Sequence, residues 1–142
     1  MNLGKRTPIR LLSRLSDARQ RRVEAVLQHF RNAFPEIEYD ILWTSRTCNA
    51  QAYLSEGKRK VRLYGGLARH KKVSVAAIAW VMAHETGHHL GGHPVHPQFP
   101  WIASEETADA WAASVGLPKA FGRRLATRYC KFGRREALRA VA

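Results

Sequence analysis

The chain has 142 residues, of which 45% are hydrophobic, so it is long enough to bury a core and is not disordered throughout. Its two cysteines, Cys48 and Cys130, are too few for a disulfide scaffold and are not spaced as a zinc pair. The longest apolar run, Val73–Ala83, has about half of the ~20 residues that a membrane-spanning helix needs, and residues 1–22 lack the apolar core of a secretory signal. We therefore expect one domain over residues 1–142, without a membrane span and located in the cytoplasm.

The net charge of +13 is large for this length, and much of it lies in two basic segments, residues 1–22 and 119–142. Arginine and lysine clusters attract polyanions such as nucleic acid. The segments therefore suggest nucleic acid or another polyanion as a partner. The alternative is a solvated basic surface that only aids solubility.

The first half of the chain predicts one helix followed by strands. Apolar residues recur at helical spacing from Asp17 to Phe34, with Ser16 as the N-cap. Residues 36–44 alternate between polar and apolar side chains, which predicts a strand with one buried face. Residues 48–66 predict two further strands joined by a turn at Ser55–Lys58.

The second half predicts helices. Val73–Leu90 is apolar nearly all round in its first half, which is typical of a buried helix. Ser104 is the expected N-cap of a helix over Glu105–Val115 that ends at Gly116.

Residues 119 onward predict a last helix, and the order of elements then gives an α+β domain with a short, antiparallel-rich sheet. The expected apolar stripe of this last helix is Phe121, Leu125, Tyr129 and Phe132.

The segment His84–His88 carries the clearest chemical pattern. Its two histidines are four residues apart in a predicted helix, so their side chains lie on one face and can bind one zinc ion. Glu85 lies to the side of this pair, where it suits the general base of the His-Glu-x-x-His arrangement. Gly87 leaves room for a neighbouring element to approach closely. The alternative is a set of surface histidines at a polar helix end.

A catalytic zinc site has three protein ligands and one open position, so a third ligand is needed. Glu105 and Asp109 are four residues apart and therefore lie on one face of the next predicted helix. One carboxylate can bind the ion while the other accepts the free ring N–H of a ligating histidine. Alternatively, Glu105 and Glu106 are only first-turn acids favoured by the helix dipole. That alternative leaves Asp109, inside an alanine-rich helix, unexplained.

Two other histidines compete for the third position. In the metzincin pattern a histidine follows ten residues after the first one, with a glycine at the seventh. Gly91 fits, but the histidine position is Pro94, and His93 is one residue early. His96 could bend back towards the site, although no spacing rule supports it.

The motifs His-Glu-Thr-Gly-His and Glu-Glu-Thr-Ala-Asp resemble those of the gluzincin zinc peptidases, of which thermolysin is the best known. The chain is most similar to soluble relatives of the CAAX prenyl proteases and HtpX-type peptidases. This resemblance implies a zincin-like domain in which Zn²⁺ is bound by His84, His88 and Glu105. It also implies that Glu85 activates water and that Asp109 orients a histidine, His84 being the expected one.

The similarity spans residues 61–117 and leaves the basic ends unexplained. The chain lacks the membrane helices of the prenyl proteases, so a membrane substrate is not implied. The family also stabilises the transition state with a downstream His, Tyr or Arg. Four residues are open for this role: His93, His96, Arg128 and Tyr129.

The motifs together predict a zinc-dependent metallopeptidase that hydrolyses protein or peptide substrates with Glu85 as general base. The segment Lys60–Gly66 is the candidate strand for holding an extended substrate by strand addition. It could equally serve only for pairing within the sheet.

Two other functions use the same residues. One is a nucleic-acid-associated protease of the SprT-like or repressor-cleaving type, whose DNA binding would fall steeply with salt. The other is a binding module that zinc only holds together, with Glu85 idle and all four metal positions closed.

Overall fold

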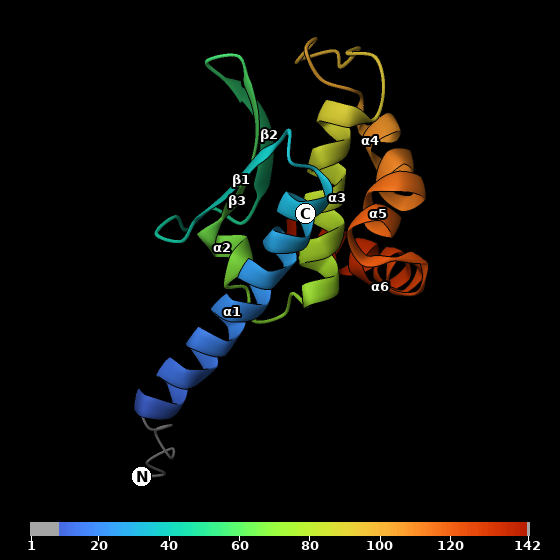
Figure 1. Cartoon of the computed structure of the whole chain (residues 1–142). Helices are drawn as coiled ribbons and strands as arrows, with labels where there is room; N and C mark the ends of the chain where they lie inside the picture. The colour runs from blue at the N-terminus through green and yellow to red at the C-terminus, as the bar shows by residue number, and fades with distance from the viewer. Residues whose placement is uncertain (1–8, 142) are drawn as a thin grey trace.

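Helix α3 is the central element of the fold, and the remaining elements pack on its two sides (Figure 1). The computed structural model describes residues 9–141, with side chains from residue 17 to residue 140. The sheet and α1 lie on one side of α3, and α4 to α6 lie on the other. This is the predicted α+β class. The elements in chain order are α1 (Ile9–Ala33), β1 (Glu38–Leu42), β2 (Ala50–Ser55), β3 (Lys58–Tyr64), α2 (Gly65–Ala68), α3 (Val75–Leu90), α4 (Glu105–Trp111), a π-helical turn (Ala112–Gly116), α5 (Leu117–Phe121) and α6 (Arg123–Val141).

The three strands form a mixed sheet in the order β1-β3-β2. β2 and β3 are the predicted antiparallel hairpin, with Ala52 opposite Val61, while β1 runs parallel to β3. Because β3 is paired on both sides, the segment Lys60–Gly66 cannot accept a substrate strand, and that prediction is wrong. Its role is the alternative one, pairing within the sheet. The strand with a free edge on the α3 side is β2.

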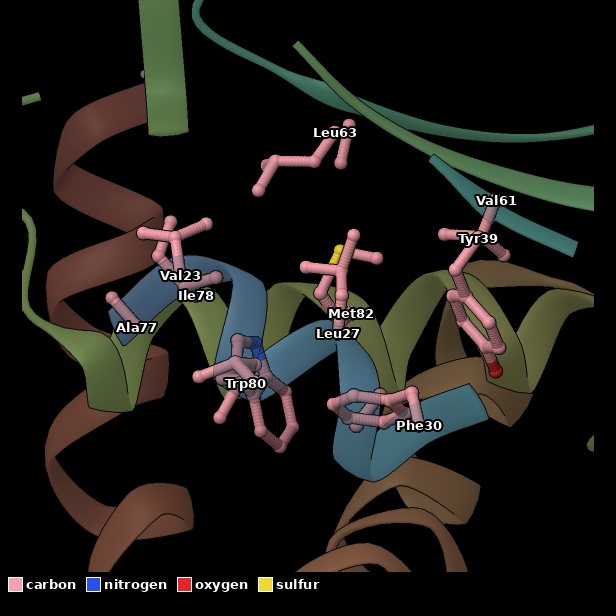
Figure 2. Close-up of a cluster of buried hydrophobic side chains, with 14 of the residues drawn as sticks. Val23, Leu27, Phe30, Tyr39, Val61, Leu63, Ala77, Ile78, Trp80 and Met82 are labelled. Atoms are coloured by element: carbon pink, nitrogen blue, oxygen red, sulfur yellow. The ribbon is translucent and has the colours of Figure 1, made fainter. Parts of the chain in front are cut away.

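The hydrophobic core lies between the sheet, α1 and α3 (Figure 2). The predicted alternation of β1 places Tyr39 inward, and the predicted helical spacing of α1 does the same for its apolar residues. Each large side chain that is fully buried stabilises the fold by about 1.5–3 kcal/mol. Core residues shown in Figure 2 are Val23, Leu27, Phe30, Tyr39, Val61, Leu63, Ile78 and Met82.

Helix α3 begins at Val75, two residues after the predicted start, ends at Leu90 as predicted, and is buried in its first half. The Ser74 hydroxyl accepts a hydrogen bond from Ala77 N and caps the first turn. Ala77, Ile78 and Ala79 are fully buried. Within residues 9–141, no helix combines the length and the apolar character needed to cross a membrane.

Helix α6 packs against α3 through small residues, so the predicted stripe of large apolar residues is partly wrong. Ala126, Gly133 and Ala137 are buried, whereas Leu125 and Phe132 are 39% and 55% exposed. A Cβ atom at Gly133 would collide with the Ala76 carbonyl oxygen of α3. The two backbones therefore come too close for large side chains to fit between them.

Two predicted helix limits are also wrong. α1 begins at Ile9, so Ser16 lies inside the helix and is not its N-cap. The preceding residues are mostly leucine and arginine, which favour helix. Gly116 does not end the second helix, since the chain continues through a π-helical turn into α5, with Pro118 in the first turn where proline is tolerated. Gly116 is needed because a Cβ atom there would lie 2.6 Å from the Trp111 ring.

The two basic segments differ in what the structure describes. In the C-terminal segment the basic side chains of α6 are exposed: Arg123, Arg124, Arg128, Lys131, Arg134, Arg135 and Arg139. In the N-terminal segment, Lys5 and Arg6 lie outside the described residues. Arg19 is half-buried and donates to the Ala68 carbonyl oxygen. Nucleic-acid binding by these segments stays a prediction.

Candidate metal centre

His84 and His88 project from one face of α3 towards the first residue of α4, Glu105. The two rings are perpendicular, with centroids 4.7 Å apart. His84 Nε2 lies 2.8 Å from one oxygen of the Glu105 carboxylate, and His88 Nε2 lies 3.2 Å from the other. The three donor atoms lie within 4.8 Å of one another. The residues predicted as ligands are therefore close enough to hold one metal ion.

The second nitrogen of each ring is fixed by an acceptor. His84 Nδ1 donates to the Asp109 carboxylate at 2.7 Å, and His88 Nδ1 donates to the Ala103 carbonyl oxygen at 2.7 Å. The proton of the neutral His88 ring is thus on Nδ1, and its Nε2 lone pair faces Glu105. His84 Nε2 presents a lone pair to Glu105 in the same way when the ring proton lies on the Asp109 side. Burial lowers the pKa of His88, which keeps this ring neutral.

Three electron-pair donors converging without a proton between them fit a cation, and histidine with carboxylate is a donor set that zinc accepts. This arrangement is the test of fit for the predicted Zn²⁺. Among the described residues, the one group of this kind is His84, His88 and Glu105, and His93 is exposed outside it. The metzincin arrangement is therefore absent.

Hydrogen bonds at and just before the N-terminus of helix α4 hold it next to α3. Ser104 caps α4 by accepting from Thr107 N, and Ala103 N donates to the His88 carbonyl oxygen at 2.8 Å. His88 and Ala103 thus bond to each other twice, through ring and backbone. Gly87 allows the close approach that its position suggested, because a Cβ atom there would lie 2.8 Å from the Ala108 carbonyl oxygen.

Glu85 points away from α4 towards the free edge of the sheet. Its Oε2 accepts a hydrogen bond from Ala52 N of β2 at 2.9 Å. Burial raises the pKa of the Glu85 carboxyl to about 7, although the electrostatic effect of the neighbouring His84 and the hydrogen bond from Ala52 N lower it in part. A carboxyl group with this pKa can accept and return a proton near neutral pH.

The metal cluster and Glu85 line one open cleft of about 750 Å³. Its lining comes from β2 and the residues before it, from the loop between α3 and α4, including Phe99 and Trp101, and from Ala137 and Leu138 of α6. The metal cluster and the edge strand β2 therefore border the same cleft.

Two contacts at the site follow from no spacing rule, although the sequence left open that His96 bends back towards the site. Arg134 of α6 donates to the second oxygen of Asp109 at 3.2 Å and lies over the Trp80 ring. His96 Nε2 lies 3.6 Å from Glu105 Oε1. Of the four candidates for stabilising the transition state, His96 lines the cleft, while His93, Arg128 and Tyr129 do not.

The family model of peptidase U49 matches residues 5–131. The chain belongs to the peptidase U49 family. No match was found to a curated protein or to a solved structure. The match includes α3, the loop and α4, and thus all residues of the cluster.

Membership in the U49 family confirms the peptidase prediction, and the substrates of this U49 peptidase are accordingly proteins or peptides. The gluzincin type and the relationship to HtpX-type peptidases stay predictions, as do the roles of the individual site residues.

Proposed function

We propose that this U49 peptidase is a zinc-dependent metallopeptidase. The observation that carries the proposal is that two imidazole Nε2 atoms and one carboxylate lie within 4.8 Å of one another. His84, His88 and Glu105 would hold the ion. Asp109 would orient His84, as carboxylates commonly do behind metal-binding histidines.

The chemistry divides between the ion and the chain. Bound zinc would polarise the scissile carbonyl and lower the pKa of water from ~15.7 towards ~7. Glu85 takes one proton from the attacking water and passes it to the leaving amine as the C–N bond breaks. Its pKa near 7 and its position in the same cleft support this role.

We propose that the substrate lies extended along β2. This strand is at the edge of the sheet and lines the cleft, so a peptide can add to it as a further strand. The Ala52 N–H on this edge already bonds Glu85, which brings the proposed base next to the bound peptide.

The decisive experiment is Glu85→Gln, with the exposed Glu106→Gln as the matched control. We expect the first variant to lose at least roughly 10²-fold in turnover of casein or a quenched-peptide library, because it removes the general base. Zinc content and circular dichroism should stay those of the wild type, and Glu106→Gln should remain active.

Full turnover by Glu85→Gln would disprove the proposed mechanism. A wild type that binds zinc but cleaves no peptide would instead favour the binding module.

A further inference from the structure

His96 lies in the loop between α3 and α4, and its ring lines the cleft beside the metal cluster. Its side chain is only 11% exposed, and its Nε2 faces Glu105 Oε1 at 3.6 Å. The ring lies edge-on to His88, with centroids 6.1 Å apart. The residue is therefore within reach of a substrate at the cluster.

The backbone of the loop fixes which ring nitrogen carries the proton. His96 Nδ1 accepts hydrogen bonds from Gln98 N and Phe99 N, both at 3.1 Å. A nitrogen that accepts must present a lone pair, so the neutral ring has its hydrogen on Nε2. The Nε2–H group points to the cluster.

The same geometry excludes His96 as a metal ligand in this orientation. Binding through Nε2 would move the hydrogen to Nδ1, where it would face two backbone N–H groups. His96 thus differs from His84 and His88, whose Nδ1 atoms face acceptors and whose Nε2 atoms carry lone pairs.

The loop holds the ring in place. Val95 N and His96 N both donate to the Ile102 carbonyl oxygen at 3.1 Å, and Ile102 N donates to the Phe99 carbonyl oxygen at 3.1 Å. The Phe99 ring packs against the imidazole, with centroids 5.3 Å apart. A donor fixed before the reaction needs no reorganisation when charge develops, and this favours catalysis.

We propose that His96 is a catalytic hydrogen-bond donor that stabilises the oxyanion of the substrate. This inference rests on the peptidase function proposed above. Water oxygen bonds to the scissile carbonyl carbon, and the carbonyl π electrons move to the oxygen. His96 Nε2–H donates to that oxygen and keeps its proton. When the carbonyl re-forms, the C–N bond breaks, and the amine takes the proton that Glu85 received from water.

The test uses His96→Ala and His96→Phe in the zinc-loaded full chain, with His93→Ala as control. Phe keeps the ring packing without the N–H, and His93 is exposed in the same loop outside the cleft. On casein and quenched peptides we expect kcat to fall roughly 10²–10³-fold in both His96 variants, as for the loss of one oxyanion donor. KM and the Kd for zinc should change less than about threefold, since the ring contributes to neither.

A second measurement does not depend on activity. Long-range ¹H–¹⁵N correlations of the zinc-loaded wild type should show the His96 ring protonated on Nε2. A ring protonated on Nδ1, or zinc affinity that falls tenfold or more in His96→Ala, would make His96 a ligand and overturn the inference.

Failure of this inference differs from failure of the peptidase proposal. An active wild type whose kcat survives both His96 substitutions disproves the donor role alone. A wild type without hydrolysis, or an active Glu85→Gln variant, disproves the proposed mechanism itself.

Discussion

Thr86, one of the two middle residues of the His-Glu-x-x-His segment, links the site helix to the sheet. Its hydroxyl donates to the Met82 carbonyl oxygen at 2.7 Å, so the Tyr39 hydroxyl, 2.8 Å away, must be the donor of the bond between them. Both residues are buried, and burial strongly raises the pKa of Tyr39. This bond ties β1 to the turn of α3 that carries the proposed ligands.

The donor and acceptor roles in these hydrogen bonds predict that two isosteric substitutions lower the unfolding free energy by different amounts. Thr86→Val leaves the buried Tyr39 hydroxyl without a partner, which costs about 1–3 kcal/mol of unfolding free energy. Tyr39→Phe leaves Thr86 bonded to Met82 and should cost only about 0.5–1.5 kcal/mol. Urea unfolding of both variants measures the difference, and a greater loss in Tyr39→Phe would show that the bond directions are reversed.

At the residue scale, the sequence predicts positions that follow from helix geometry. Spacing of four places His84 beside His88, whose rings are found side by side, and puts Glu105 and Asp109 on one helix face, where both carboxylates contact His84. His96 could not be assigned in advance because its orientation depends on loop backbone bonds. The contact of Arg134 with Asp109 depends on how α6 crosses α3, which no local spacing encodes.

Among the elements, α6 shows how a helix can pack tightly with few large apolar residues. Its buried positions are mainly alanine and glycine, and the exposed positions include leucine and phenylalanine. Hydrophobic periodicity is therefore only partly right for this helix, since Tyr129 packs against the core whereas Leu125 and Phe132 are exposed. The apolar run of α3 and the alternation of β1 predict correctly because large side chains mark their buried positions. The sequence misplaces the start of α1 and the end of the second helix because Ser16 and Gly116 are residue types that often cap helices. Here both residues lie inside helical segments.

Gly133→Ala tests the close packing of α6 on α3. Alanine gains up to about 1 kcal/mol in helix propensity, but its methyl group collides with backbone at Ala76, and overpacking costs about 1–3 kcal/mol. We expect a net loss of unfolding free energy, measured by urea denaturation, while the exposed Arg135→Ala stays near the wild type. A more stable Gly133→Ala protein would show that the helices are farther apart than described.

For the whole molecule, the proposed metal site joins the central helix to the helical side of the fold. Its ligands come from α3 and from the first residue of α4. An ion bound there therefore restrains α4 against α3, in addition to its proposed catalytic role.

Chelation should consequently destabilise the entire chain. At a free zinc concentration of 100 to 1,000 times Kd, binding contributes about 2.7–4.1 kcal/mol to stability. We expect EDTA to lower the Tm of the wild type and of Glu106→Ala, with recovery on adding zinc. Glu105→Ala, which removes a ligand one position away, should bind zinc more weakly and respond less. Equal zinc affinity in the two variants would disprove the assignment of Glu105 as the third ligand.

The bond between Ala52 N and Glu85 has a mechanical consequence for the whole enzyme. β2, the strand proposed to align the peptide, also positions Glu85, the carboxylate proposed to activate water. Peptide alignment and proton transfer therefore both depend on the position of β2. A peptide that bends β2 away from α3 would break the bond between Ala52 N and Glu85 and displace the proposed general base. Misaligned peptides would therefore be cleaved slowly even when they bind well.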